Sequence, residues 1–297
     1  MAETVNNFPI EQAHVVTFTA NVMAALARQP GMLVGRMSGS SYIGDKAQVV
    51  NFIGPIAFVR QENVYQPTTP VEVEHTQRWI TADDYNAAVL IDNLDKLRMI
   101  WDPTSPYVEE MRKGAARTQD DIAAAAFFAD ARTGKQGVTS TTFRAANAIA
   151  DGGTGMTTAK LRSLRKLMKK SFVDLRAERP MVGVTADEVD GLLAETVVGS
   201  FDYNSLKPLN DGEITSWFGF DLVPLEGLPA VAPSGGVRQC PAWVSSGMHF
   251  GTWQAPVMTI NQRPDLNNIY QLHGRLTMGA TRLDESKVYK VGCAGAT

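Results

Sequence analysis

Two β-prone runs joined by a short loop constrain this chain more than any other feature. Parts of residues 46–80 alternate apolar and polar side chains, as in residues 71–74 (VEVE), and residues 66–70 (QPTTP) form a turn or loop between the runs. We therefore predict a two-stranded hairpin over residues 46–80, in which about fifteen residues per strand would reach on the order of 50 Å. An isolated ribbon is barely stable in water, so a ribbon this long must pack on another surface.

The residues before this ribbon form a segment with little packing potential of its own. Residues 15–28 have apolar side chains at helix-like intervals, and the turn at residues 29–31 (QPG) ends that pattern. Residues 32–45 are rich in glycine and serine, which favours an extended conformation. We predict an N-terminal arm over residues 1–45 that lies on a neighbouring subunit. Its first ten residues lack the apolar core of a secretory signal.

The strongest helix signal lies in residues 105–132. Residues 102–106 (DPTSP) are a start signal, with Ser105 as the predicted N-cap and Pro106 at the first helical position. The helical pattern continues to Gly134, a residue type that commonly ends helices. A helix of this length spans roughly 40 Å, which is long against a mean of about 11–12 residues in globular proteins. We predict that it acts as a structural spine.

The second half of the chain predicts a mixture of helices and strands. Residues 157–178 form an amphipathic helical pattern that Pro180 ends. Residues 181–197 indicate a strand and then a short helix, residues 214–226 indicate another strand, and residues 241–293 are a series of β-prone segments. The expected fold class is α+β.

Patterns of catalysis and metal binding are missing from the sequence. Its four histidines are isolated from one another, and no serine lies in a nucleophile elbow. Cys240 and Cys293 are far apart and outside any CxxC pair, so we expect two reduced thiols. The run Gly152–Gly155 before a helix can seat an anion, but a flexible loop fits it better. We expect no catalytic residue, no metal and no cofactor.

Charge and hydropathy restrict the classes of partner. The formal net charge of −3 excludes a surface that is basic throughout. No stretch approaches the roughly 18–20 apolar residues that span a bilayer, so we expect a soluble protein that does not bind a membrane. One basic cluster is concentrated in the predicted helix at residues 157–178, and its members are Lys160, Arg162, Arg165, Lys166, Lys169 and Lys170.

Two interpretations of this basic cluster remain open. It can contact nucleic-acid phosphates, or it can be the solvated face of an amphipathic helix that pairs with acidic residues of a neighbour. We favour the solvated face, because no aromatic residue interrupts the cluster before Phe172 and base stacking is unsupported.

The order of features around residues 78–135 resembles one protein family. After the hairpin come, in sequence, Tyr85, Ala88, Ile91, Asp92, Asp95, Asp102-Pro103, Ser105, Tyr107, Asp120-Asp121, an alanine run and Thr133-Gly134-Lys135. Together they resemble tailed-bacteriophage major capsid proteins with the Hong Kong 97-type fold, and residues 261–293 resemble the last strands of that family. The likeness covers most of residues 46–293 and rests on many small matches in a specific order.

The resemblance implies a domain organisation. Residues 1–45 would be an N-arm and residues 46–80 the extended hairpin called the E-loop. Residues 81–155 and 255–297 would form a peripheral domain with the spine helix at 105–132. Residues 156–254 would form an axial domain that gathers around symmetry axes. The implied function is self-assembly into an icosahedral head, made in a bacterial cytoplasm and enclosing double-stranded DNA.

The resemblance also implies partners. These are further copies of the chain in hexamers and pentamers, a portal protein, a decoration protein, and packaged DNA held by weak non-specific contact. Only about 45 residues precede the hairpin, so we expect a separate scaffolding protein. The hairpin has no lysine between Lys46 and Lys96, so we expect no covalent Lys–Asn link between subunits. Candidate intersubunit contacts are Arg60, Glu62, Glu72, Glu74 and Arg78.

Two alternatives remain at this point. A protein compartment of the encapsulin type would have the same fold and would enclose an enzyme in place of DNA. A soluble enzyme with an unrecognised pocket would be a different class of protein. Electron microscopy of the expressed chain and the nucleic-acid content of its particles would separate these alternatives.

Overall fold

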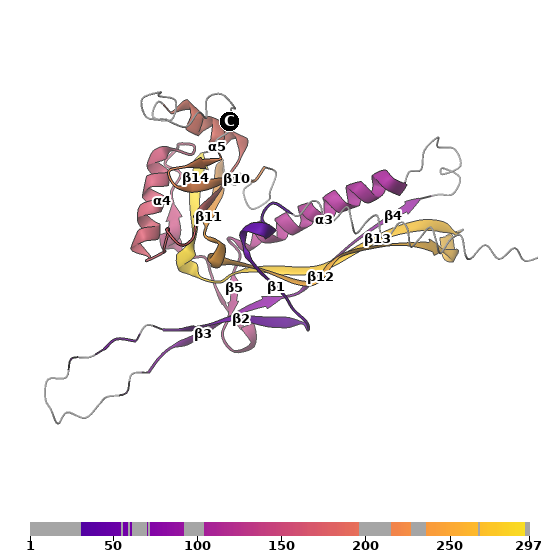
Figure 1. Ribbon diagram of the computed structural model, residues 1–297, viewed down its shortest axis with the longest axis horizontal. Coiled ribbons are helices and arrows are strands. Elements are labelled where there is room, and N and C mark those ends of the chain that lie inside the picture. Colours follow the sequence, from indigo (N-terminus) through magenta and orange to yellow (C-terminus); the bar gives the residue numbers. More distant parts are fainter. Residues whose placement is uncertain are drawn as a thin grey trace, which may run out of the picture.

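The computed structural model is elongated, with a compact lobe at one end, long strands that run away from the lobe, and a hairpin that projects separately (Figure 1). It describes residues 31–54, 56–58, 60, 70, 72–91, 104–195, 215–226, 236–266 and 268–294. Helices and strands are mixed along the chain, as the α+β prediction requires.

The lobe is built on a six-stranded sheet with the order β7-β14-β11-β8-β10-β9. Its strands are β7 (Ala148–Ile149), β8 (Met181–Val184), β9 (Ser216–Trp217), β10 (Phe220–Pro224), β11 (Val237–Trp243) and β14 (Val288–Ala294). Helices α4 (Thr158–Lys170) and α5 (Ala186–Ala194) flank this sheet (Figure 1). The apolar stripe of α4 at Leu161, Leu164 and Met168 is fully buried in the main core.

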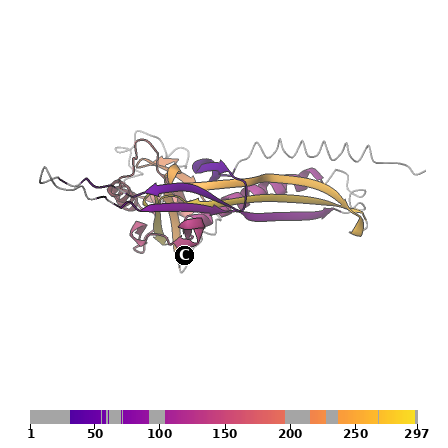
Figure 2. The same ribbon diagram turned by 90° about the horizontal axis from the view of Figure 1, so that it is seen from below.

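A second sheet, with the order β1-β12-β13-β4, forms the long part of the molecule. Its strands are β1 (Ser38–Ser41), β4 (Asp83–Ile91), β12 (Met248–Arg263) and β13 (Ile269–Arg282). Figure 2 shows β4, β12 and β13 side by side along the long axis. Helix α3 (Thr104–Ala126) packs along β13. In the described parts of the chain, no helix is long and apolar enough to cross a membrane.

Strands β2 (Lys46–Ile53) and β3 (His75–Thr81) form the base of the predicted hairpin. They pair antiparallel along their whole length, so the predicted pairing is confirmed for these residues. Strand β3 also pairs with β5 (Ala131–Thr133), which pairs with β6 (Thr139–Thr141). The base of the hairpin is therefore part of a four-stranded sheet and is supported by its own subunit.

Two predicted helices are shorter than their sequence patterns indicate. Helix α3 begins at Thr104, so Ser105 lies inside it, and it ends at Ala126 rather than at residue 132. Residues 127–129 form a turn, and the chain then enters strand β5. Helix α4 ends at Lys170, and Phe172 has a positive φ of 58°, which a helix cannot continue through.

The described part of the N-terminal arm lies on its own subunit, contrary to our expectation. Strand β1 pairs parallel with the start of β12, and Leu33 is fully buried in the main core. The predicted helix at residues 15–28 lies outside the described residues. Two apolar side chains, Leu33 and Met37, therefore supply packing that the glycine- and serine-rich composition of residues 32–45 obscured.

Candidate functional site

Three charged side chains meet where the hairpin, helix α3 and strand β13 converge. Arg78 of β3 and Arg282 of β13 each place a guanidinium nitrogen 3.2 Å from the carboxylate of Glu285. The Arg282 side chain is fully buried, and burial lowers the pKa of Arg78 while the Glu285 carboxylate opposes that shift. Both guanidinium groups depend on Glu285 to offset the cost of desolvation. We call Arg78, Arg282 and Glu285 the junction triad.

Arg282 of the junction triad also explains where helix α3 ends. Its guanidinium donates to the carbonyl of Phe127 at 2.9 Å and to the carbonyl of Ala129, and it reaches the carbonyl of Thr141 at 3.3 Å. Phe127 and Ala129 follow the last residue of the helix, and a carbonyl that accepts from Arg282 is not used for a further helical turn. Arg282 therefore joins the end of α3 to strand β6, and the guanidinium lies 5.4 Å from the ring centre of Phe143.

The hairpin presents large apolar side chains at the outer end of its supported base and beyond it. Ile53, Ile56 and Phe58 are 64%, 59% and 100% exposed. Residues beyond β2 and β3 still approach each other, because the Gly54 N–H donates to the Glu74 carbonyl at 2.8 Å. Apolar side chains of this size are costly to leave in water, so this part of the hairpin is a candidate surface for contact with another molecule.

The predicted intersubunit contact residues fall into three groups. Arg60, Glu72 and Glu74 are exposed on the hairpin. Glu62 lies outside the described residues. Arg78 is 6% exposed and pairs with Glu285 of the same chain. Arg78 therefore fastens the hairpin base internally, and we remove it from the set of proposed intersubunit contacts.

A buried histidine ties the N-terminal segment to strand β12. The Tyr42 hydroxyl lies 2.8 Å from Nε2 of His249, and the Ser38 hydroxyl lies 2.9 Å from Nδ1. Because Ser38 donates to the Met248 carbonyl, a neutral ring that is protonated at Nδ1 satisfies every group. Burial lowers the pKa of His249 and favours this neutral form. The partners lie more than 200 positions away, so sequence reasoning had no signal for them.

Cys240 and Cys293, expected as unrelated thiols, lie together inside the lobe. They sit on the adjacent strands β11 and β14, and their sulfur atoms and a carboxylate oxygen of Glu188 all lie within 4.8 Å of one another. The hydrogen bond with Cys293 and burial raise the pKa of Cys240, which keeps this thiol protonated. Glu188 already accepts from Thr185 and Arg238. The arginine charge disfavours a metal ion here, and we interpret the cluster as core packing.

The glycine-rich run before α4 does not present a free anion site. The carboxylate of Glu195 accepts from the backbone N–H of Thr158 in the first turn of the helix. The buried ammonium of Lys160 donates to the carbonyls of Thr154, Gly155 and Gly292 at 2.7 to 2.9 Å. This member of the basic cluster is therefore structural, and it anchors the loop to strand β14.

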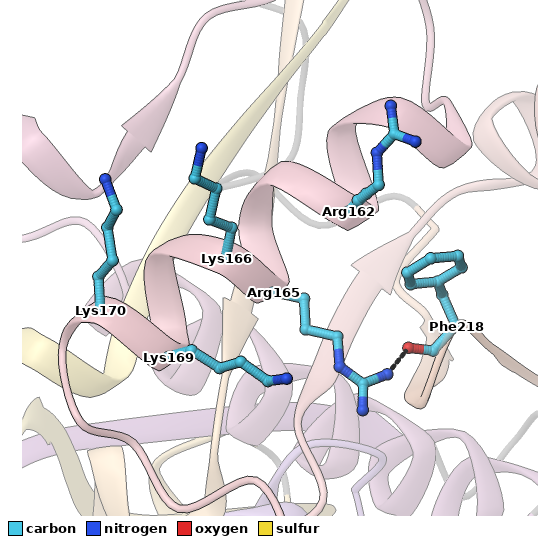
Figure 3. Close-up of a pocket in the computed structure, with 6 residues that line it drawn as sticks. All are labelled: Arg162, Arg165, Lys166, Lys169, Lys170 and Phe218. Carbon is cyan, nitrogen blue, oxygen red and sulfur yellow. Dashed lines mark hydrogen bonds between the residues drawn. The ribbon is translucent and has the colours of Figure 1, made fainter.

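The other members of the basic cluster lie on one face of α4, where all are exposed except the half-buried Arg165. Figure 3 shows them in two rows along the helix, with the ring of Phe218 beside the arginines. The side chains surround a shallow pocket, whose lining residues are Arg162, Arg165, Lys166, Lys169, Lys170 and Phe218. The sequence pattern identified the cations, but it had no signal for Phe218, which comes from the turn between β9 and β10.

A family model described as "Phage capsid protein" matches residues 10–295, and no curated protein matches the sequence. The capsid structure of cyanophage P-SCSP1u aligns with a TM-score of 0.68 at 16% identity, over 88% of this chain and 87% of that one. The capsid of cyanophage Pam1 aligns with a TM-score of 0.67 at 11% identity, over 90% and 93%. A structure of Mycobacterium phage Che8 aligns with a TM-score of 0.64 at 15% identity, over 86% of each chain.

Proposed function

The chain belongs to the phage capsid protein family and has the Hong Kong 97-type capsid fold, and from this premise we propose how it builds a head. It is a structural, shell-forming component of the virion and not an enzyme. We propose that its copies gather as hexamers and pentamers into the icosahedral head of a tailed phage, made in the cytoplasm of a host bacterium. The enclosed genome is double-stranded DNA.

The observation that carries the proposed mode of assembly is the exposed hairpin. Ile53, Ile56 and Phe58 have large exposed apolar surfaces on a segment whose base is held rigidly by the junction triad. Burial of such side chains between subunits contributes roughly 1.5–3 kcal/mol each. Every subunit repeats the contact, and closure of a symmetric shell adds the contributions. The exposed charges of Arg60, Glu72 and Glu74 then select the register between neighbours.

The proposed domain organisation follows the arrangement of the sheets. The lobe with α4 and α5 contains most of the proposed axial domain at residues 156–254, but its sheet also includes β7 and β14, which lie outside that range. The long sheet and α3 correspond to the peripheral domain at residues 81–155 and 255–297, and β2 and β3 begin the E-loop at residues 46–80. The boundary at residue 254 falls inside strand β12, where its pairing with β13 is irregular between Thr252 and Val257. That irregularity supports a joint between the two domains.

The proposed partners are a separate scaffolding protein, a portal protein, a decoration protein and packaged DNA. Because the hairpin sequence lacks a lysine between Lys46 and Lys96, we propose that non-covalent contacts alone hold the subunits together. Mass spectrometry of denatured particles tests this point. A single species at the mass of one chain supports the proposal, and species at the masses of covalently linked multimers contradict it.

Assembly itself is tested by electron microscopy of the full-length chain, expressed alone and together with a scaffolding protein of the same phage. We expect closed particles in at least the second case. A monodisperse monomer or dimer in both cases contradicts the proposal. Phage-derived particles should contain DNA, whereas shells that hold an enzyme cargo in place of DNA would indicate a compartment of the encapsulin type.

A further inference from the structure

Within the described residues, five cations of helix α4 have no acidic partner, and all of them are exposed except the half-buried Arg165. We call this set the α4 cationic surface, and its members are Arg162, Arg165, Lys166, Lys169 and Lys170. Among the described residues, none of the five forms an ion pair. Arg165 donates to the carbonyl of Phe218, which leaves its charge uncompensated. The surface is a local exception on a chain whose net charge is −3.

The subunit does not need this concentration of charge in order to fold. Cations three or four positions apart on a helix repel one another, and this surface contains several such pairs, Arg162 with Lys166 and Lys166 with Lys170 among them. Lys169 and Lys170 lie in the last turn, where a cation interacts favourably with the helix dipole, but this does not remove the repulsion between neighbouring cations. The buried stripe on the opposite face already holds α4 in the core. Repulsion within the surface therefore opposes the stability of the helix, and a partner of opposite charge would relieve it.

The spacing of the cations suits a polyanion. Residues 162–170 span about 12 Å of helix axis and carry five positive charges, while duplex DNA carries one negative charge per about 1.7 Å of its axis. Three of the five are lysines, which are hydrated point charges on flexible stems. Such side chains follow a phosphate backbone without fixing its register. The five cations also lie in two rows beside a shared pocket, as Figure 3 shows.

An acidic face on a second copy of the chain fits less well. Acidic side chains of the lobe are largely engaged within their own subunit. Asp187 pairs with Arg238, Asp221 pairs with Arg179, and Glu195 accepts from the first turn of α4. The described lobe therefore offers no dense row of free carboxylates that matches five cations.

We propose that the α4 cationic surface contacts the phosphate backbone of the duplex DNA that the shell encloses. This inference rests on the proposed function and adds the site of contact. Each subunit supplies at most five phosphate contacts without base readout, so the binding is non-specific and weakens steeply with salt. Many subunits act together on one genome, while the weakness of each contact lets the DNA slide during packaging and release.

The test compares DNA binding by unassembled full-length subunits that differ by two charges. The double variant Lys166→Gln, Lys169→Gln removes two cations from the surface and leaves Arg165 in place. We would measure affinity for a short fluorescent duplex by anisotropy over a salt series. The slope of log affinity against log salt should fall by about two, since each lost phosphate contact removes about 0.9. The melting temperature should be unchanged or higher, because helical repulsion is reduced.

A charge-matched control is the double variant Lys113→Gln, Lys135→Gln, which removes two exposed cations from α3 and from the 3-10 turn at residues 135–137. Its salt slope should equal that of the unaltered chain. An equal loss of slope in both double variants would overturn the site. Tighter binding of poly-glutamate than of DNA, or of single strands than of duplex, would overturn the assignment to duplex phosphates.

Shell formation is scored separately by electron microscopy. If the unaltered chain never assembles, the proposed function fails whatever the DNA binding shows. If Lys166→Gln, Lys169→Gln binds DNA normally but forms no shells, the surface is a contact between subunits and this inference fails. Assembled shells with a reduced salt slope in the subunit assay are the expected result.

Discussion

Among single residues, Glu285 determines whether two buried guanidinium groups are paired. Its carboxylate lies 3.2 Å from both Arg78 and Arg282, and the side chains of these arginines are 7% and 0% exposed. Glu285→Gln removes the charge and leaves both cations uncompensated. We expect a loss of about 3–5 kcal/mol in the free energy of unfolding, which chemical denaturation of the subunit would measure.

A matched control for Glu285 exists on helix α3. Glu110 pairs with Arg117, but these side chains are 60% and 66% exposed. Because water screens such a pair, Glu110→Gln should leave the free energy of unfolding nearly unchanged. Equal losses in the two variants would show that burial of the junction triad contributes nothing to its strength.

His249 gives the stability of the fold a pH dependence of known sign. Burial lowers its pKa in the folded chain, while the unfolded chain keeps a value of about 6.5. As the pH falls below 6.5, the unfolded chain binds a proton that the folded chain resists. The contribution of neutral His249 is therefore complete above about pH 6.5 and is lost as the pH falls towards the lower folded pKa.

The pH prediction is measured as the unfolding midpoint between pH 8 and pH 5. The unaltered chain should lose more stability over this range than His249→Gln, which cannot titrate at this position. His75→Gln, the same replacement at an exposed position of β3, serves as the control. Parallel curves for the unaltered chain and His249→Gln would contradict the prediction.

Among secondary-structure elements, helix α3 holds the N-terminal segment through one side chain. The carboxylate of Asp120 accepts from the backbone N–H groups of Met32 at 3.1 Å and Leu33 at 2.9 Å. Asp120→Ala should therefore increase amide hydrogen exchange in residues 32–41, while the global stability falls by about 1–3 kcal/mol because the N–H of the fully buried Leu33 loses its acceptor. Asp121→Ala is the control, since Asp121 is an exposed neighbour. Unchanged protection of residues 32–41 in Asp120→Ala would refute this role.

The ends of the helices show how far local patterns predict an element. The amphipathic pattern of residues 157–178 predicted the helix that α4 forms, because helical periodicity is a property of neighbouring residues. The end of α3 was predicted wrongly, because the carbonyls of Phe127 and Ala129 are taken by Arg282, a residue more than 150 positions away. A long-range partner of this kind leaves no trace in a helical pattern.

For the molecule as a whole, we propose that the hairpin acts in contacts between subunits. Arg60 is exposed, so Arg60→Glu should leave the circular dichroism spectrum and melting temperature of the subunit unchanged. It should reduce the yield of particles in electron micrographs, because a reversed charge meets the wrong partner at a neighbour. Arg60→Lys keeps the charge and should restore much of the yield. Normal particles from Arg60→Glu would exclude this residue as an intersubunit contact.

The sequence alone predicted the features that depend on neighbouring residues and the order of the elements along the chain. The β-prone runs of the hairpin, the long helix and the last strands were recognised from side-chain periodicity, and their order identified the capsid family that the match over residues 10–295 shows. The absence of a catalytic pattern agreed with a structural family. Periodicity and order survive in a single chain because they depend on residues close together in sequence.

Contacts between distant residues became visible only in the folded chain. Arg78 was predicted as an intersubunit contact, yet it is committed to Glu285, 207 positions away. The arm was expected on a neighbour, yet Leu33 is buried in its own subunit. Phe218, which lies in the turn between β9 and β10, lines the same pocket as the cations of α4. In each case burial and pairing depend on which surfaces the fold brings together, and the spacing of residues along a chain does not encode that.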